Sequence, residues 1–191
     1  MPLNPEALRS LLDAADLSSS HPAGPTRRAA VFALLVPREH TNLLLIRRAD
    51  RGDPWSNHLA FPGGHLEPTD SSALAAAYRE TEEETGIPPD AITCLGELGH
   101  FQTWTKPVDV HAFVGLWNAA GPLRVNPTEV AEVLEVSWSR LVREHEAQGF
   151  AGRGVDELGL TLVYPLGGLE IWGVTARMIH CLIETASRSS G

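Results

Sequence analysis

The sequence predicts an α/β fold in which a mixed sheet is packed between helices. Two apolar runs of strand length, residues 29–36 and 42–48, precede a long helical pattern over residues 71–85. A second long helical pattern covers residues 173–186. Strands interspersed with helices in this way are typical of domains in which helices cover a sheet. With 191 residues and 43 % apolar residues, the chain can bury one full hydrophobic core.

The N-terminal stretch predicts a short amphipathic helix followed by a linker. Asn4 suits the N-cap of a helix over residues 4–17, in which leucines form an apolar stripe. Residues 18–25, SSSHPAGP, have the composition of a linker. We therefore expect residues 1–25 to form a helix and linker, and residues 26–191 to form one domain.

Further signals follow in order along the chain. Residues 48–58, RADRGDPWSNH, predict a loop, and residues 139–148 predict a helix. The remaining strands are expected at residues 59–64, which end in a glycine turn, and at 92–98, 108–117, 130–138 and 158–166.

Glutamates of the 71–85 helix are sorted onto one face. Around the helix axis, Glu84 lies about 40° and Glu83 about 60° from Glu80, on either side of it. Glu82 falls on the opposite side. Like charges at these spacings repel, and the face carries no lysine that would offset them.

Two interpretations of this acidic face are open. The ordinary one is a solvated, charged helix surface. The other is a cation site, because the acids occupy the C-terminal half of the helix, where the macrodipole disfavours negative charge. The turn FPGG at residues 61–64 also brings backbone oxygens close to a ligand. Carboxylates and backbone carbonyls are the ligands that Mg²⁺ or Mn²⁺ prefers.

This segment resembles the Nudix box, the signature of the Nudix hydrolases. Residues 79–87, RETEEETGI, match its second half, with Thr81 in the apolar slot. The first half departs from the pattern: five residues after Gly64 lead to Asp70 instead of Glu, and eight rather than seven residues then reach Arg79. The same longer spacing, after FPGG and with Asp in the acid slot, occurs in the coenzyme A pyrophosphatase branch of the family. The resemblance implies a Nudix fold, an α/β/α sandwich.

The likeness to that branch extends over about residues 28–186 and includes LLLIRR, EVAEVLEVSW and GLEIWGVTARMI. The loop before FPGG departs from the branch. Arg48 keeps the place of the branch's arginine. Where the branch usually carries Thr, Arg, His and Gly, this chain has Ile46, Asp53, Trp55 and Asn57.

The resemblance implies metal-dependent cleavage of a pyrophosphate bond. Glu83 and Glu84 would bind Mg²⁺ or Mn²⁺ directly. A backbone carbonyl at Gly63 or Gly64 would complete that contact. Glu80 would bind metal or deprotonate the attacking water, which a bound cation makes more acidic.

The remaining box residues would have structural roles. Arg79 would pair with a loop acid, either Asp70 or Glu67, and Gly86 would close the helix. A further acid from a distal segment often completes the metal site in this family. The candidates, between which the sequence does not choose, are Glu129, Glu132, Glu97 and Asp109.

Substrate contacts are expected on both sides of FPGG. Arg48 is the candidate for a phosphate contact, and the Gly63 backbone would approach the ligand. His58 and His65 flank the turn, and each is either a phosphate contact, with His65 preferred, or an ordinary loop histidine. Trp55 would stack on a base or anchor the loop to the core.

The activity that follows is hydrolysis of a nucleoside diphosphate derivative, with coenzyme A or its thioesters first. Nucleoside triphosphates, nucleotide sugars and dinucleoside polyphosphates are the alternatives. A catalytically silent ligand-binding Nudix domain and an isomerase on the same fold are the rival classes. The isomerases use a cysteine before the box, whereas Cys94 and Cys181 follow it.

Composition restricts partners and location. The net charge of −9 argues against nucleic-acid or anionic-membrane binding, and no apolar run is long enough to span a bilayer. The first residues lack the pattern of a secretory signal, and two widely separated cysteines fit a reducing compartment, so we expect a cytoplasmic protein. The expected partners are a small-molecule nucleotide-diphosphate substrate and, as one option, a second copy of the chain in a homodimer.

Overall fold

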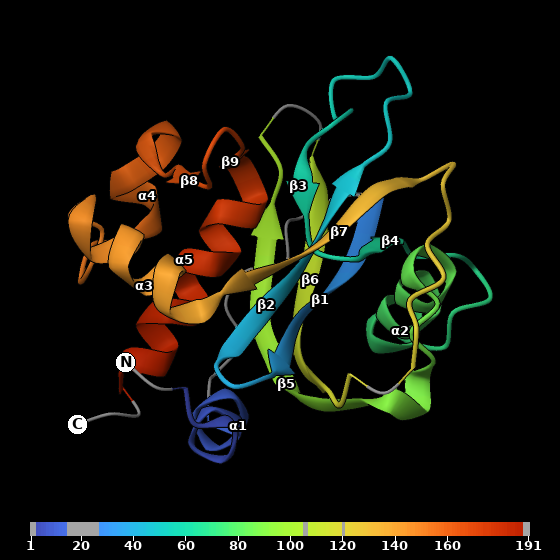
Figure 1. The fold of residues 1–191 in the computed structure, drawn as a ribbon, viewed down its shortest axis with the longest axis horizontal. Helices are drawn as coiled ribbons and strands as arrows, with labels where there is room; N and C mark the ends of the chain where they lie inside the picture. The colour runs from blue at the N-terminus through green and yellow to red at the C-terminus, as the bar shows by residue number, and fades with distance from the viewer. Residues whose placement is uncertain (1–2, 15–26, 105–106, 120, 189–191) are drawn as a thin grey trace.

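The computed structural model describes residues 3–14, 27–104, 107–119 and 121–188 (Figure 1). The main sheet contains β1 (Arg27–Pro37), β2 (Thr41–Arg48), β3 (Leu59–Ala60), β4 (Gly63–His65), β5 (Ile92–Gln102), β6 (Val108–Trp117) and β7 (Val130–Ser137). The α-helices are α1 (Pro5–Asp13), α2 (Ala73–Thr85), α3 (Trp138–Ala147), α4 (Val155–Leu158) and α5 (Gly173–Ser187). Short 3₁₀ turns, η1 (Pro89–Ala91) and η2 (Gly159–Thr161), and a small sheet of β8 (Tyr164–Pro165) and β9 (Glu170–Ile171) complete the described elements.

The main sheet is mixed, as predicted. Its strands are ordered β3-β2-β1-β6-β5, with β4 paired to β1 and β7 paired to β2. Strands β1 and β6 run parallel, and the other pairings are antiparallel. The parallel pair needs a long crossover, which contains α2 and β5.

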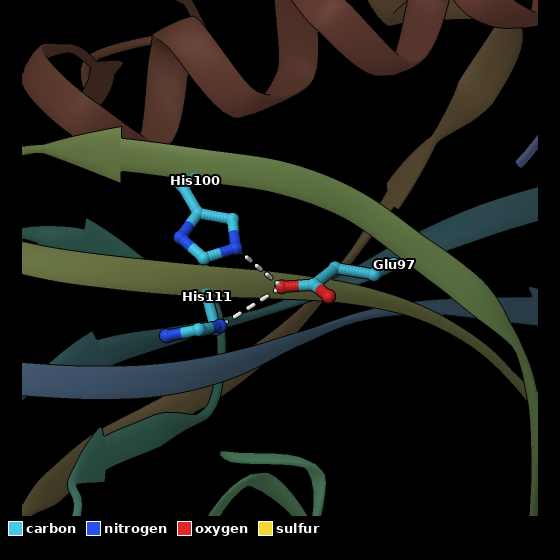
Figure 2. A group of neighbouring side chains, drawn as sticks. All are labelled: Glu97, His100 and His111. Carbon is cyan, nitrogen blue, oxygen red and sulfur yellow. Dashed lines mark hydrogen bonds and ion pairs between the residues drawn. The ribbon is translucent and has the colours of Figure 1, made fainter. Parts of the chain in front are cut away.

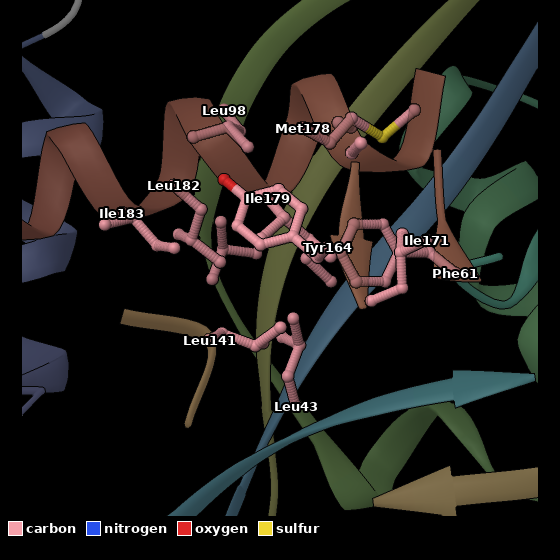
Figure 3. Packing of buried hydrophobic residues seen from close by; sticks show 14 of the residues in the cluster. Leu43, Phe61, Leu98, Leu141, Tyr164, Ile171, Met178, Ile179, Leu182 and Ile183 are labelled. Atoms are coloured by element: carbon pink, nitrogen blue, oxygen red, sulfur yellow. The ribbon is translucent and has the colours of Figure 1, made fainter. Parts of the chain in front are cut away.

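Helices cover both faces of this sheet, which confirms the predicted α/β architecture. On one face, α2 packs over β1 and closes the smaller core cluster, to which Phe32, Ala76 and Ala77 belong. On the other face, α1, α3 and α5 enclose the larger cluster (Figures 1 and 3). Strand β1 contributes to both clusters, so its residues are buried almost without alternation.

The N-terminal helix begins as predicted and ends earlier. The Asn4 side chain accepts hydrogen bonds from the backbone amides of Glu6 at 3.0 Å and Ala7 at 3.2 Å. Leu8 and Leu12 are buried in the larger cluster, so α1 is part of the core. The helix ends at Asp13 and not at residue 17, and the predicted linker lies outside the described residues.

Two predicted strands differ from the structure. The prediction of a strand over residues 158–166 is wrong, because this segment forms the end of α4, then η2, and reaches strand geometry only in β8. Its apolar residues are buried at helical spacing, as Leu158 and Leu162 are, and Gly159 has a φ of +50°. The predicted strand over 59–64 is split at Pro62, which has no backbone N–H: β3 pairs with β2, and β4 pairs with β1.

Candidate active site on helix α2

The helix that carries the glutamates is defined by its two end residues. The Ser72 hydroxyl accepts a hydrogen bond from the Ala75 amide at 3.1 Å and caps the N-terminus. Gly86 has a φ of +73° and donates its N–H to the Glu82 carbonyl at 2.8 Å. A Cβ on Gly86 would also overlap Arg124. Both the positive φ and this overlap therefore exclude a side chain at this position.

The acidic face meets the FPGG turn. Glu84 is 3 % exposed, and its carboxylate accepts a hydrogen bond from the Gly63 amide at 2.9 Å. The Glu80 carboxylate lies directly over Gly64, where a Cβ would overlap it. The Glu83 side chain is 53 % exposed, and Glu82 is exposed too. Two of the three predicted metal ligands are thus held against the glycine turn, and the third is exposed and pairs with Arg79.

Burial makes the charged form of these carboxylates costly. Desolvation raises the pKa of Glu84 to about 8, and the neighbouring charges of Glu80 and Glu129 act in the same direction. Desolvation also raises the pKa of Glu80, against the lowering effect of Arg79. A cation bound between these groups would remove this cost, so the site is chemically suited to one.

Arg79 links the helix to the loop before it. Its guanidinium donates to both carboxylate oxygens of Asp70 at 3.0 Å and to the His65 carbonyl at 3.1 Å. The same side chain reaches Glu80 at 3.0 Å and Glu83 at 3.3 Å. These hydrogen bonds lower the pKa of Asp70 and raise that of Arg79.

Of the two acids considered for Arg79, the structure brings Asp70 to it. Glu67 contributes its backbone amide, which donates to Asp70 at 2.7 Å. Asp70 therefore joins the loop backbone at Glu67 to Arg79 of the helix, whereas Ser72 caps the helix.

One of the distal acids lies near the box. The charge of Glu129 raises the pKa of both Glu80 and Glu84. Its carboxylate accepts a hydrogen bond from Arg51 at 3.1 Å. Glu132 instead pairs with Arg47 at 3.3 Å. The remaining candidates, Glu97 and Asp109, contact histidines on β5 and β6.

Oxygen ligands dominate the group formed by Glu80, Glu83, Glu84 and Glu129. A buried carboxylate with a raised pKa beside two other acids is the arrangement that a hard divalent cation stabilises. The described residues therefore fit Mg²⁺ or Mn²⁺.

Arg48 extends the site toward a substrate. Its positive charge lowers the pKa of Glu84, and its Nε is buried without a hydrogen-bond partner among the described residues. Its backbone pairs with His58 and Asn57 in the loop that follows β2. A buried guanidinium N–H without a partner is a natural donor to a phosphate oxygen.

The loop over residues 48–58 is folded back on itself. Asp53 accepts hydrogen bonds from the Trp55 amide at 2.8 Å and the Ser56 hydroxyl at 3.3 Å. Asn57 has a φ of +64°, a conformation that Gly and Asn adopt most readily. Asn57 thus turns the chain in a left-handed conformation immediately before His58 and β3.

Arg51 secures this loop to the distal segment and was not singled out from the sequence. It donates to the Thr128 carbonyl at 2.8 Å as well as to Glu129. These partners lie 77 and 78 residues away along the chain, and no local pattern connects them.

Two depressions flank the FPGG turn. The larger, about 350 Å³, lies between the loop and the β8–β9 region and includes His58, Leu59 and Trp172. There, His58 contacts the Trp172 ring edge-on at 4.3 Å and Trp55 at 6.0 Å between ring centroids. The smaller, about 290 Å³, is lined by Arg27, Arg28, His65 and Leu66. Trp55 therefore lies beside a residue of the larger depression, and His65 lines the smaller one.

In the part of the chain that the structure describes, no helix is both long and apolar enough to cross a bilayer.

Comparison with known proteins identifies the family. The NUDIX domain matches residues 26–155. The Nudix hydrolase NudL of Yersinia pestis (strain Pestoides F), itself described as uncharacterized, is 34 % identical over 178 residues, which cover 90 % of this chain and 86 % of that protein.

Solved structures share the fold at low identity. A NUDIX hydrolase from Alicyclobacillus acidocaldarius aligns with a TM-score of 0.53 at 18 % identity, over 66 % of this chain and 85 % of its own. The C. elegans Ap4A hydrolase has a TM-score of 0.51 at 20 % identity, over 63 % and 85 %. The NUDIX domain of Shewanella oneidensis NrtR, complexed with ADP ribose, has a TM-score of 0.51 at 15 % identity, over 70 % and 85 %. The chain belongs to the Nudix hydrolases, metal-dependent enzymes that act on pyrophosphate bonds of phosphorus-containing compounds.

Proposed function

We propose that this protein is a Mg²⁺- or Mn²⁺-dependent pyrophosphohydrolase that cleaves the diphosphate bond of coenzyme A or its thioesters. The observation that carries the hydrolytic part of the proposal is the buried Glu84 carboxylate, held by the Gly63 amide beside Glu80. A group of carboxylates that is so costly to ionise without a cation is suited to work with one.

Each box residue receives a role in this proposal. Glu80, Glu83 and Glu84 hold the metal with the Gly64 carbonyl, and Glu129 is the distal acid that completes the set. A bound divalent cation would supply charge neutralisation for the diphosphate and acidify the attacking water. In this proposal Glu80 also orients that water and accepts its proton, while hydrogen bonds between Arg79 and Asp70 fix the loop and helix relative to each other.

Water adds to one phosphorus, and the bond from that phosphorus to the bridging oxygen breaks. The second phosphate leaves with the bridging oxygen. For coenzyme A the products are 3′,5′-ADP and a phosphopantetheine. Positioning and charge stabilisation account for most of such a reaction, because the protein forms no covalent bond.

The substrate contacts lie on both sides of the turn. Arg48 donates its unpartnered Nε–H to a phosphate oxygen. Trp55 stacks on a base at the edge of the larger depression, and Gly63 allows the ligand to approach the backbone. His65, beside the exposed Arg27 and Arg28, contacts a further phosphate group.

Coenzyme A is favoured by the resemblance of the FPGG segment, the Asp70 slot and the box spacing to the coenzyme A branch. The left-handed Asn57 supports a recognition loop of related shape. The names of two structural relatives, an Ap4A hydrolase and an ADP ribose complex, agree with a nucleotide attached through phosphate groups. Nucleoside triphosphates, nucleotide sugars and dinucleoside polyphosphates are the alternatives.

The test is hydrolysis of a panel of these compounds with Mg²⁺ and with Mn²⁺, resolved by mass spectrometry. Release of 3′,5′-ADP from coenzyme A is the expected result. Glu84→Gln should reduce turnover by about 100-fold or more, since a metal contributes several kcal/mol to the transition state. The matched control is Glu82→Gln, an exposed acid on the far side of the same helix.

Three results would contradict the proposal or part of it. If another compound were cleaved and coenzyme A were not, the proposed substrate would be wrong and the proposed mechanism would stand. Tight binding without turnover across the panel would indicate a silent ligand-binding domain, and equal activity of wild type and Glu84→Gln would refute the metal site.

A further inference from the structure

A second group of metal-ligating side chains lies outside the box, on β5 and β6. Glu97 and His100 come from β5, and Asp109 and His111 come from β6. Figure 2 shows the Glu97 carboxylate and the two imidazoles converging between the strands. The potential ligand atoms of Glu97, His100 and His111 all lie within 4.8 Å of one another.

A β-bulge creates this group. In a regular strand, residues three apart point to opposite faces, so Glu97 and His100 would be separated by the sheet. The register of β5 shifts between Glu97 and Gly99, which places Glu97 opposite Phe113 and His100 opposite His111. The extra residue turns both side chains to one face, and bulges are common where a strand re-aims a side chain toward a site.

The two imidazoles lie between two carboxylates. Glu97 Oε1 is 3.2 Å from His100 Nε2 and 2.9 Å from His111 Nδ1. The other nitrogen of each ring faces Asp109 Oδ2, at 3.4 Å from His100 and 3.8 Å from His111. The ring centroids are 4.0 Å apart.

The proton count of this arrangement is unfavourable without a cation. A neutral imidazole has one N–H and one lone pair, so whichever nitrogen carries the proton, the other is an acceptor that faces the carboxylate of Glu97 or of Asp109, also an acceptor. If both rings are charged, two positive rings lie 4.0 Å apart. Either state carries a repulsive contact in a place that water reaches poorly.

Burial of Asp109 and His111 makes these repulsive contacts more costly. Asp109 is 2 % exposed and His111 is 9 % exposed. Within the described part of the chain, Asp109 Oδ1 and His111 Nε2 have no hydrogen-bond partner. Buried polar atoms without partners are rare and costly, and a bound ion is one of their ordinary explanations.

We propose that Glu97, His100 and His111 form a binding site for a divalent transition-metal ion such as Zn²⁺ or Co²⁺. The ion takes the lone pairs of His100 Nε2, His111 Nδ1 and a Glu97 oxygen, so the remaining ring N–H groups both point to Asp109. Metal-bound histidines commonly donate their second N–H to a carboxylate in this way. The observed separations of 2.9 and 3.2 Å are close to those of two ligands sharing one ion at about 2.0–2.2 Å.

This site is distinct from the box in place and in chemistry. Gly64, Ala30 and His111 lie in one row across β4, β1 and β6, so His111 is two strand spacings, about 10 Å, from the glycine turn. Both sites are on the sheet face covered by α2, because Ala30 and Phe113 belong to the cluster beneath that helix. Two imidazoles select softer ions than the oxygen ligands of the box do.

Co²⁺ binding to purified protein tests the proposal in a Glu80→Gln/Glu83→Gln/Glu84→Gln background, where the three carboxylates of the box helix are neutral. The expected result is one Co²⁺ per chain, with the visible absorption of imidazole-bound Co²⁺. His111→Gln should abolish it, and Asp109→Asn should weaken it by about 10–100-fold. His40→Gln, at an exposed histidine in the β1–β2 turn, should leave it unchanged.

Absence of Co²⁺ binding in this background, or binding that survives His111→Gln, would overturn the proposal. A measurement without cluster variants guards against misfolding: in ¹⁵N-histidine-labelled protein, Zn²⁺ should shift the ring signals of His100 and His111 and leave His40 in place. Since neither readout is catalysis, the outcome is independent of the proposed hydrolase.

Discussion

The backbone amide of Gly63 donates a hydrogen bond of 2.9 Å to the Glu84 carboxylate, 21 residues further along the chain. This contact joins the glycine turn to the last turn of α2. Gly63 has a φ of +144°, and a side chain there would overlap β1 at Ala30 and Val31. The glycine therefore allows the turn to lie between the sheet and the helix, where its amide reaches the carboxylate.

The raised pKa of Glu84 predicts how the stability of the metal-free protein depends on pH. The folded pKa of about 8 lies above the ordinary value of 4.5, so the folded state holds a proton that the unfolded chain releases. Stability should be unaffected by this group below about pH 4.5. It should fall by up to about 1.4 kcal/mol per pH unit between there and about pH 8, and then level off. Chemical denaturation in EDTA across this range measures the effect.

Glu84→Gln is the matched comparison for this prediction. The variant should lose this part of the slope, because the amide does not ionise, and Mg²⁺ at pH 8 should stabilise wild type more than the variant. Parallel pH profiles of the two proteins would show that Glu84 is not the group responsible.

The arginine that joins helix and loop predicts a second stability difference. Arg79 makes a two-pronged contact with Asp70, whose side chain is 5 % exposed. Lysine keeps the charge and cannot reproduce the paired hydrogen bonds. Arg79→Lys should therefore lower the melting temperature more than Arg153→Lys does, because Arg153 and Glu157 form an exposed pair. Equal melting temperatures for the two variants would mean that Arg79 contributes no more to stability than the exposed Arg153 does.

Much of the helix was predictable from sequence because its determinants are local. The end glycine, the sorting of acids onto one face and the Arg79–Asp70 pair all lie within a short segment. The proximity of Glu129 to Glu80 and Glu84 was not predictable, because it arises only through the pairing of β7 with β2. The contact of His58 with Trp172 likewise joins segments that no periodicity relates.

The group of metal-ligating side chains on β5 and β6 was not predictable from the sequence, for a different reason. Sequence alternation places Glu97 and His100 on opposite faces, and only the shift of register before Gly99 reverses this. Bulges depend on the pairing of two strands, which a single strand's pattern does not reveal.

Two left-handed glycines allow conformational strain to be separated from a steric contact. Gly86 and Gly52 have nearly equal φ values, +73° and +69°. A Cβ at position 52 meets nothing within 4 Å, whereas one at position 86 overlaps Arg124. Gly52→Ala should cost about 1–2 kcal/mol of unfolding free energy, the cost of a left-handed alanine. Gly86→Ala should lower the unfolding free energy, measured by urea denaturation, clearly more than Gly52→Ala does. Equal losses would show that the segment around Arg124 moves aside at no cost.

Gly64→Ala should weaken metal binding with little loss of stability. The new methyl group would occupy the space of the Glu80 carboxylate, a side-chain end that can swing aside, so the fold is expected to survive and the ligand geometry to change. Gly154→Ala is the control, because that glycine has an ordinary φ of −72° and open space around its Cβ position. We expect the Mg²⁺ concentration for half-maximal activity to rise by about 10-fold or more in Gly64→Ala, a loss of about 1.4 kcal/mol, and to stay unchanged in Gly154→Ala. An unchanged Mg²⁺ requirement in Gly64→Ala would exclude Glu80 from the metal site and leave it only the role of orienting water.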